Sequence, residues 1–168
     1  MAEQVAAFFS GIPSHWIALS LASLPILELR GSIPWAILAG GMSWQGAFVW
    51  SVIGNFIPVI PILLLLEPSA NYLRRWVIFD KFFNWLFART RRKGKLIERY
   101  EALGLLLFVA TPLPGTGAWT GALAAFVFGV RFRLSLPIIT LGILLAGIIV
   151  TSVVVGGSTA TKALLGVH

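Results

Sequence analysis

Cysteine is absent from the 168 residues of this chain, and histidine occurs only twice, at His15 and His168. Without thiols the protein can form neither a disulfide nor a thiolate metal site. The sequence motifs of common hydrolases and metalloproteases, GxSxG and HExxH, are missing, and so is a set of paired carboxylates. We therefore expect no catalytic residues, no metal and no cofactor.

Charge is also scarce, because only 11% of the residues are charged whereas 58% are hydrophobic. A soluble domain usually has about 25% charged residues. This composition predicts an integral membrane protein rather than a soluble domain.

The few cations are unevenly placed, since nine of the 13 Lys and Arg residues fall within residues 74–99. The net charge of +7 therefore belongs to one segment, which argues against nucleic-acid binding. Basic loops beside transmembrane segments mark the cytoplasmic side. We predict a multi-pass protein of the cell (inner) membrane with residues 74–99 in the cytoplasm. Because Glu3 is the only charge in residues 1–13, we expect no cleaved leader.

Two apolar stretches are long enough to cross a bilayer, which takes about 20 residues. They are residues 44–66 and residues 134–155. The first contains Asn55, Pro58 and Pro61, so a kink is expected there.

Two other apolar stretches are interrupted. Residues 15–41 are broken by a polar segment at 28–34, and residues 102–129 are broken at 111–117. Each arm has roughly 9 to 13 residues and would cover about half a bilayer. The pattern predicts two re-entrant hairpins, whose irregular turns must lie inside the protein.

The pattern occurs twice along the chain. Gly41 and Gly54 are 13 residues apart, Gly129 and Gly142 have the same spacing, and an offset of 88 residues superposes both pairs. If the chain crosses the membrane an odd number of times between the two halves, the halves have opposite orientations and are inverted repeats, as in many transporters. The alternative is coincidence, because the chain has 17 glycines.

The predicted fold class is an all-α integral membrane protein with two inverted repeats. Each repeat is a broken, re-entrant helical hairpin followed by a transmembrane helix, and a basic amphipathic interfacial helix joins the two. That helix could dock anionic lipid headgroups, or its charges could simply fix the topology. The single domain 1–168 divides into repeat one (14–67), the linker (68–100), repeat two (101–156) and a tail (157–168).

Glu28 and Arg30 are the strongest candidate site residues, because a charge at the bilayer centre costs about 2.5–3.5 kcal/mol. Residues two apart do not face each other on a helix. Either the backbone is irregular here, or each side chain has another partner. We expect Ser32 to cap the following helix, with Pro34 in its first turn. Arg30 beside that helix N-terminus would cradle a phosphate, and Glu28 would exchange a proton. The alternative is an anchor at the water boundary.

The second turn, residues 111–117, carries no charge. Its candidate binding residues are Thr111 and the N–H groups of Gly115, Thr116 and Gly117, which could form an anion nest before a helix. The alternative is a plain helix break in which the hydroxyls cap the next helix.

Three further polar residues remain. Arg131 and Arg133 follow the second hairpin and would either anchor the protein at the interface or reach back to a bound headgroup. Asn55 is expected to bridge helices rather than to bind a ligand.

Two motifs carry a resemblance that covers nearly the whole chain. The sequences Glu28-Leu-Arg-Gly-Ser-Ile-Pro34 and Thr111-Pro-Leu-Pro-Gly-Thr-Gly117 resemble the two signature loops of the putative small multidrug export protein family. That family is in turn similar to the DedA (VTT-domain) superfamily. The resemblance implies two inverted re-entrant hairpins and movement of polyprenyl phosphates or phospholipids, with proton coupling.

The resemblance also implies roles for individual positions. Glu28 matches the acidic residue of the first hairpin, and Arg131 and Arg133 roughly match arginines beyond the second. Pro112, Pro114 and Gly115 match the P-x-P-G of the second hairpin. DedA proteins often carry a further acid near these motifs, but a threonine follows the P-x-P-G here, which weakens a relay between two carboxylates.

These observations favour a flippase-like transporter of an anionic lipid phosphate, such as undecaprenyl phosphate or a phospholipid. One alternative is proton-driven efflux of small cationic drugs, which would leave Arg30 unexplained. Another is a membrane scaffold that transports nothing. We also expect a homodimer, because two spans and two hairpins are little material to shield polar turns from lipid.

Overall fold

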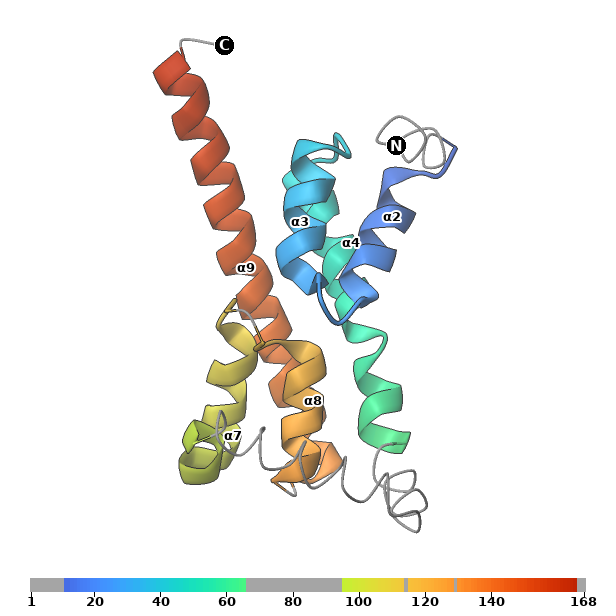
Figure 1. The fold of residues 1–168 in the computed structure, drawn as a ribbon, viewed down its shortest axis with the longest axis vertical. Helices are drawn as coiled ribbons and strands as arrows, with labels where there is room; N and C mark the ends of the chain where they lie inside the picture. The colour runs from blue at the N-terminus through green and yellow to red at the C-terminus, as the bar shows by residue number, and fades with distance from the viewer. Residues whose placement is uncertain (1–10, 66–94, 114, 129, 166–168) are drawn as a thin grey trace. The chain divides into compact units, whose positions relative to one another are not determined.

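The structure is a computed structural model, and it describes residues 11–65, 95–113, 115–128 and 130–165. These residues form helices joined by short loops and contain no strand, as the composition predicts (Figure 1). The predicted interfacial helix and most of the basic segment lie outside the described residues. The helices are α2 (Ser14–Ser23), α3 (Glu28–Leu38), α4 (Trp44–Phe56), α7 (Lys95–Ala110), α8 (Ala118–Val127) and α9 (Phe132–Leu165).

Two of the described helices are long and apolar enough to cross a membrane, Trp44–Leu65 with 22 residues and Phe132–Ser158 with 27. The first contains the expected irregularity, a turn at residues 57–58 after α4, beside Pro58. The second differs from its expected bounds, because α9 runs on to Leu165 where a tail was expected from residue 157.

The described chain forms two compact units, and the first contains residues 11–55 and 147–165. In this unit α2 and α3 form a helical hairpin with its turn at residues 24–27 (Figure 1). The hydroxyl of Ser14 donates to the carbonyl of Gly40 at 2.8 Å and so ties the open end of the hairpin together.

Small buried residues hold this first hairpin against α4. The hydroxyls of Ser32 and Ser51 are 2.6 Å apart, and the Ser32 hydroxyl also lies 2.6 Å from the carbonyl oxygen of Ala18. Both serines are fully buried. One hydrogen-bond chain therefore links α2, α3 and α4, and each bond typically contributes about 0.5–1.5 kcal/mol net.

The turn of the hairpin lies level with the middle of the first span. The Ser23 hydroxyl, at the end of α2, donates to the carbonyl of Gly54 at 2.8 Å. A Cβ on Gly54 would collide with the backbone of Leu19, so the two helices touch closely here. Gly54 lies 10 residues after Trp44, which begins α4. At 1.5 Å per residue this is a depth of about 15 Å.

The second unit contains residues 56–65 and the described residues from 95 to 146. Here α7 and α8 form another hairpin, which packs against the first part of α9. A Cβ on Gly142 would lie 2.7 Å from Cβ of Val109, and one on Gly121 would collide with Cγ2 of the same valine. Val109 and Ala110 are buried where α7 ends, so this turn lies level with Gly142.

An offset of 88 residues relates the two units. It places Trp44, the first residue of α4, on Phe132, the first residue of α9. It also places Gly54 on Gly142, so each hairpin meets its helix at a glycine 10 residues from the start of that helix.

The same offset relates two hydroxyls at the hairpin turns. The hydroxyl of Ser23 donates to the carbonyl of Leu19 at 2.9 Å, and that of Thr111 donates to the carbonyl of Leu107 at 2.6 Å. Both bonds close the last turn of the incoming helix. These contacts match at the offset of 88 residues, and the inverted repeat itself stays a prediction.

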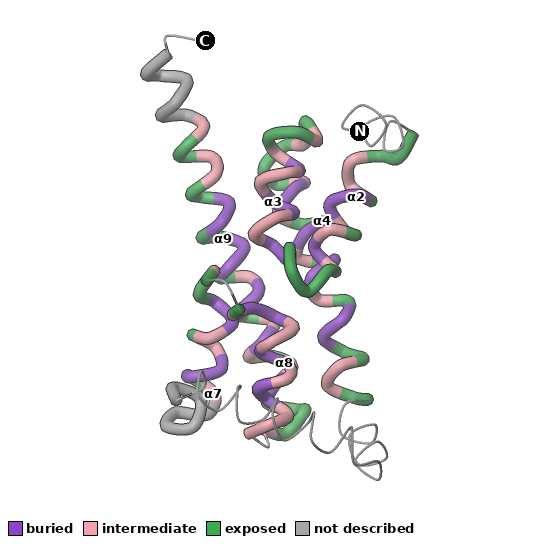
Figure 2. Tube along the Cα trace, viewed as in Figure 1, coloured by how far each residue is buried: buried purple, intermediate pink, exposed green. Residues whose placement is uncertain are grey.

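The outward faces of the helices are apolar. Purple, buried positions follow the contacts within each unit, and exposed positions alternate with them along α9 (Figure 2). Exposed large residues on α9 are Leu141, Leu145, Ile148, Ile149 and Val153. Such surfaces suit lipid, so the two apolar helices and these faces indicate a membrane protein.

Candidate functional site

Glu28 stands at the turn of the first hairpin in an unusual backbone conformation. It is the first residue of α3, and its φ of 46° is the one positive value among the described residues other than glycine. The left-handed region costs an L-residue roughly 1–2 kcal/mol. Such strain persists only where the surroundings impose it, and it often marks a functional site.

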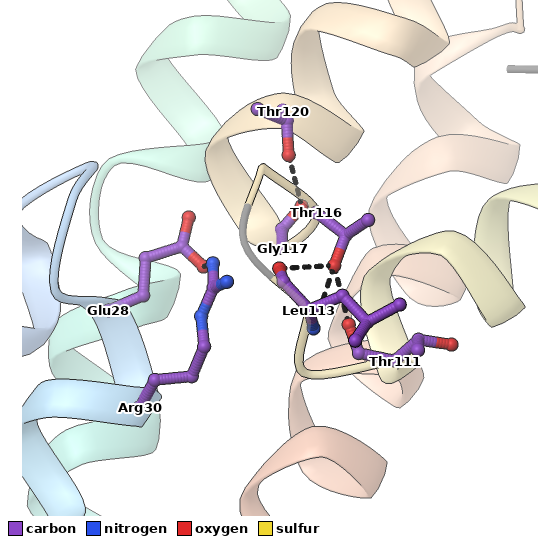
Figure 3. Close-up of polar contacts among 7 residues, drawn as sticks. All are labelled: Glu28, Arg30, Thr111, Leu113, Thr116, Gly117 and Thr120. Carbon is purple, nitrogen blue, oxygen red and sulfur yellow. Dashed lines mark hydrogen bonds and ion pairs between the residues drawn. The ribbon is translucent and has the colours of Figure 1, made fainter. Parts of the chain in front are cut away.

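Glu28 and Arg30 form an ion pair at this turn. Nη2 of Arg30 lies 3.3 Å from Oε2 of Glu28, and their side chains are 24% and 5% exposed (Figure 3). The irregular backbone allows a pairing that a regular helix forbids at this spacing. The separation exceeds the 2.7–2.9 Å usual for charge-assisted bonds. The Arg30 side chain is partly exposed.

The prediction that Ser32 caps a helix is wrong. α3 begins at Glu28 with Leu27 in the N-cap position and no side-chain cap bond. Ser32 and Pro34 therefore lie inside the helix, where the Ser32 hydroxyl joins the buried bonds to α2 and α4. Ser32 thus has a packing role in the structure, and direct contact with a substrate stays a prediction.

The N-terminus of α3 is partly occupied by the chain itself. The N–H of Glu28 donates to the carbonyl of Leu24 at 3.1 Å, and the N–H of Gly31 donates to that of Leu27 at 2.9 Å. Fewer N–H groups remain for an anion than an open helix end would offer. The guanidinium of Arg30 is therefore the stronger anion-binding group at this turn.

The loop between α7 and α8 is organised by the hydroxyl of Thr116. This oxygen lies 2.6 Å from the carbonyl of Thr111, 2.8 Å from that of Leu113, and 3.2 Å from the Leu113 nitrogen (Figure 3). Gly115 and Gly117 have φ values of 85° and 138°, which L side chains rarely adopt. The loop is thus shaped by two glycines and one hydroxyl.

The structure changes part of what was expected of this second loop. The N–H of Thr116 donates to the carbonyl of Leu113 at 3.1 Å, so it does not point to an anion, whereas binding at the N–H groups of Gly115 and Gly117 stays a prediction. Nor do the hydroxyls cap the next helix, since Gly117 occupies the N-cap of α8 and no side-chain cap bond is formed. The hydroxyls bond to carbonyls instead.

Arg131 and Arg133 are exposed at the start of α9. They precede Gly142, which meets the turn of the hairpin, by 11 and 9 residues. At 1.5 Å per residue they lie about 14–16 Å along the helix from the loop. The structure does not bring them together with Thr116, and their position favours interfacial anchors. A contact with a headgroup stays a prediction.

Asn55 is buried without the bridge that the sequence predicts for it. Its side chain is buried at 2% exposure on α4, and Oδ1 has no hydrogen-bond partner. The expected bridge between helices is therefore not formed by this oxygen. Its position beside Gly54, the residue that receives the hairpin turn, is the signal that could have singled it out.

Metal binding finds no support among the residues that the structure describes, because they contain no cluster of three or more His, Cys, Asp or Glu side chains. The candidate residues of the first unit are thus an ion pair and a buried amide, and those of the second unit form a loop of hydroxyls and glycines.

Comparison with known families assigns the chain. The model of a family described as "Putative small multi-drug export protein" matches residues 28–149. The chain belongs to this family. The matched region begins at Glu28, includes the loop at 111–117 and extends well into α9. Neither a curated protein nor a solved structure is matched by the chain.

Proposed function

We propose that the protein moves an amphipathic anion across the membrane, a lipid phosphate such as undecaprenyl phosphate or a phospholipid. The observation that carries the proposal is the Glu28–Arg30 pair at the turn of the first hairpin. The description of the family as exporters agrees with transport and leaves the substrate class open.

The depth of the ion pair supports transport rather than anchoring. Trp44 begins the first span and is 52% exposed, as tryptophans at a membrane interface often are. The hairpin turn lies level with Gly54, about 15 Å further along, which is half of a hydrocarbon core of about 30 Å. Charges at that depth are costly and usually belong to a transport pathway.

The chemistry of Arg30 favours a phosphate or another oxyanion. A guanidinium offers a planar fork of N–H donors that fits such groups, and its charge persists in a low-dielectric site. Arg30 is held by a bond of 3.3 Å to Glu28 and remains partly exposed. An incoming phosphate therefore competes with the Glu28 carboxylate for the same guanidinium.

This competition suggests how protons could be coupled to transport. When Glu28 takes up a proton it no longer neutralises Arg30, and the guanidinium is free to pair with the anion. When Glu28 releases the proton the ion pair re-forms and the anion leaves. One proton would accompany each anionic charge that Arg30 binds.

The proposed topology follows from the order of the elements. Among the described residues one candidate span lies between the two hairpins, and with it the hairpins would enter the membrane from opposite sides as inverted repeats. With residues 74–99 in the cytoplasm of a cell-membrane protein, the first hairpin enters from outside and the second from inside. DedA proteins, to which the family is similar, are thought to share this plan. A homodimer would shield the turns from lipid.

Efflux of small cationic compounds is the second candidate, because the family description names multi-drug export. Glu28 would then bind the cation, and Arg30 would have to move away from it.

Transport into proteoliposomes distinguishes the candidates. We expect a labelled polyprenyl phosphate to move with wild-type protein and a cationic dye to stay outside. Arg30→Ala should strongly reduce the phosphate flux, and Arg30→Lys should reduce it less, because lysine keeps the charge but lacks the bidentate fork. Normal flux in Arg30→Ala, or movement of the dye alone, would overturn the proposal. Flux of neither probe with correctly folded protein would favour a scaffold.

A further inference from the structure

The contact between α3 and α4 fixes which residues face each other at the hairpin turn. The two helices are consecutive and antiparallel, and their Ser32 and Ser51 hydroxyls are 2.6 Å apart. Side chains four residues apart share a helix face. One turn back from Ser32 is Glu28, and one turn on from Ser51 is Asn55. The register therefore places Asn55 opposite Glu28.

Moving one helical turn the other way along both helices gives a check on this register. One turn on from Ser32 is Ala36, and one turn back from Ser51 is Ala47. These alanines are both fully buried and belong to one packed cluster. Glu28 and Asn55 continue the row and are likewise buried, at 3% and 2% exposure. The face between α3 and α4 thus carries two small apolar residues, two hydroxyls, and then an acid opposite an amide.

Asn55 offers an unused acceptor in this row. Its Oδ1 has no hydrogen-bond partner, and an unpaired buried oxygen is unfavourable. An ionised carboxylate only accepts hydrogen bonds, so it cannot satisfy an amide oxygen. A protonated carboxyl has an O–H to donate. The unpaired oxygen therefore matches the protonated form of the side chain opposite it.

We propose that Asn55 accepts a hydrogen bond from the protonated carboxyl of Glu28 and thereby stabilises the state in which Arg30 can bind an anion. The inference rests on the proposed function in one respect, that Glu28 takes up and releases a proton. It adds Asn55 as a positioning residue that acts through Glu28.

The exchange balances in atoms and charge. A proton from water binds Glu28, and its O–H points to Oδ1 of Asn55. The Glu28–Arg30 pair then changes from neutral to one positive charge, which an anionic oxygen neutralises. Loss of the proton restores the ion pair of 3.3 Å and leaves Oδ1 without its donor, which is the arrangement observed.

Few other charges lie on the residues of this unit whose side chains the structure describes. His15 lies near the start of α2, at the opposite end of the hairpin from Glu28. α4 contains no charged residue, and α9 contains none between residues 147 and 158. Among these described side chains, Arg30 is the charged group that shares the turn with Glu28.

Infrared titration of the purified full-length protein in liposomes tests the inference without a transported substrate. The carbonyl band of the protonated acid is followed against pH, and the contribution of Glu28 is the part lost in Glu28→Gln. Asn55→Leu removes the acceptor while keeping a similar volume. We expect the midpoint to move to lower pH by about one unit, the equivalent of one ordinary hydrogen bond. The band should also move toward the frequency of a carboxyl without a hydrogen bond.

Thr151→Val is the matched control. Thr151 lies in the same unit, is 7% exposed, and also has a buried oxygen without a partner. This variant should leave the Glu28 midpoint unchanged. A midpoint that does not move in Asn55→Leu, or moves equally in Thr151→Val, overturns the inference.

The infrared band of the wild-type protein tests the inference even if Asn55→Leu does not fold. If protonated Glu28 in the wild type absorbs at the frequency of a carboxyl without a hydrogen bond, the inference is wrong. The titration is separate from flux. Loss of phosphate flux in Arg30→Ala with no effect of Asn55→Leu would refute only the role of Asn55. An effect of Asn55→Leu in a protein that moves no phosphate would refute only the proposed substrate.

Discussion

The two hairpins have closely matching frameworks and different chemistry at their turns. With the offset of 88 residues, Glu28 falls on Thr116 and Arg30 falls on Ala118. The acid and the arginine of the first turn thus correspond to a hydroxyl and a methyl group in the second. The close glycine contacts therefore belong to the architecture of both halves. The charged pair, in contrast, belongs to the turn of the first half.

The turns also differ in what holds them. The first is tied to its neighbouring helix, because the Ser23 hydroxyl donates to the Gly54 carbonyl at 2.8 Å. The second is tied to itself through the Thr116 hydroxyl and needs two glycines with positive φ. The first turn therefore depends on a contact with α4, whereas the second depends on contacts within its own loop.

Replacement of Arg30, the cation of the first hairpin turn, should reduce transport flux more than any other change. Arg30→Ala removes a charge-assisted bond to the substrate, and such bonds contribute about 1.5–3 kcal/mol, so flux of a labelled polyprenyl phosphate should fall about 10- to 150-fold. Ala118→Val, at the matching position, is a control for the second hairpin. Equal flux in wild type and Arg30→Ala would show that the first turn does not bind the anion.

The two close glycines should respond unequally to a methyl group. Gly54→Ala places a Cβ against the Leu19 backbone, which cannot move aside, whereas Gly142→Ala meets the Val109 side chain, which can rotate. Overpacking typically costs about 1–3 kcal/mol, and we expect Gly54→Ala to be at the upper end. Thermal unfolding in detergent measures both variants. A larger loss in Gly142→Ala would contradict the comparison.

The two matching hydroxyls within α3 and α8 should also differ. Ser32 shares two buried contacts of 2.6 Å, whereas Thr120 has one contact of 3.4 Å to the carbonyl of Gly117. Ser32→Ala also leaves the Ser51 hydroxyl and the Ala18 carbonyl without this partner. We expect it to lower stability by about 1–3 kcal/mol and Thr120→Val by less than about 1 kcal/mol. Equal losses in chemical unfolding would show that the first hairpin is not specially held.

At a single pH, replacement of Glu28 should change the flux least. Glu28→Gln should flatten the dependence of flux on pH, because the amide cannot gain or lose a proton. Thr116→Val, at the corresponding position of the second hairpin, should keep the wild-type profile shape even if it lowers the rate. Flux measured across a pH series gives both profiles. A wild-type profile in Glu28→Gln would remove this residue from proton coupling.

The sequence predicted the elements of the fold well because hydrophobic runs and helix breakers act locally. The span at 44–66, its irregularity near Pro58 and the break at 111–117 follow from runs of apolar residues and from proline and glycine. The break of the first hairpin was expected at 28–34, but these residues are helical in α3 and the turn lies at 24–27. The end of α9 was placed too early, since two glycines and several small residues after position 155 did not stop the helix. Helix ends depend on small energy differences that composition does not settle.

The candidate site was predicted in part. Intramembrane charge singled out Glu28 and Arg30, and their irregular backbone was one of two stated alternatives. The Ser32 cap was wrong because its partners, Ala18 and Ser51, lie on other helices. Asn55 was undervalued for the same reason, since the register between two helices cannot be read from either one alone.

The order of the elements has a consequence for biogenesis. Each hairpin precedes in the chain the long helix that holds it, α4 for the first and α9 for the second. When α2 and α3 leave the ribosome, the Ser51 hydroxyl and the Gly54 carbonyl that receive them are still inside the exit tunnel. The first hairpin carries a charged turn, and a charge is costly to place in a bilayer. We therefore expect the first hairpin to enter the membrane together with the helix that holds it.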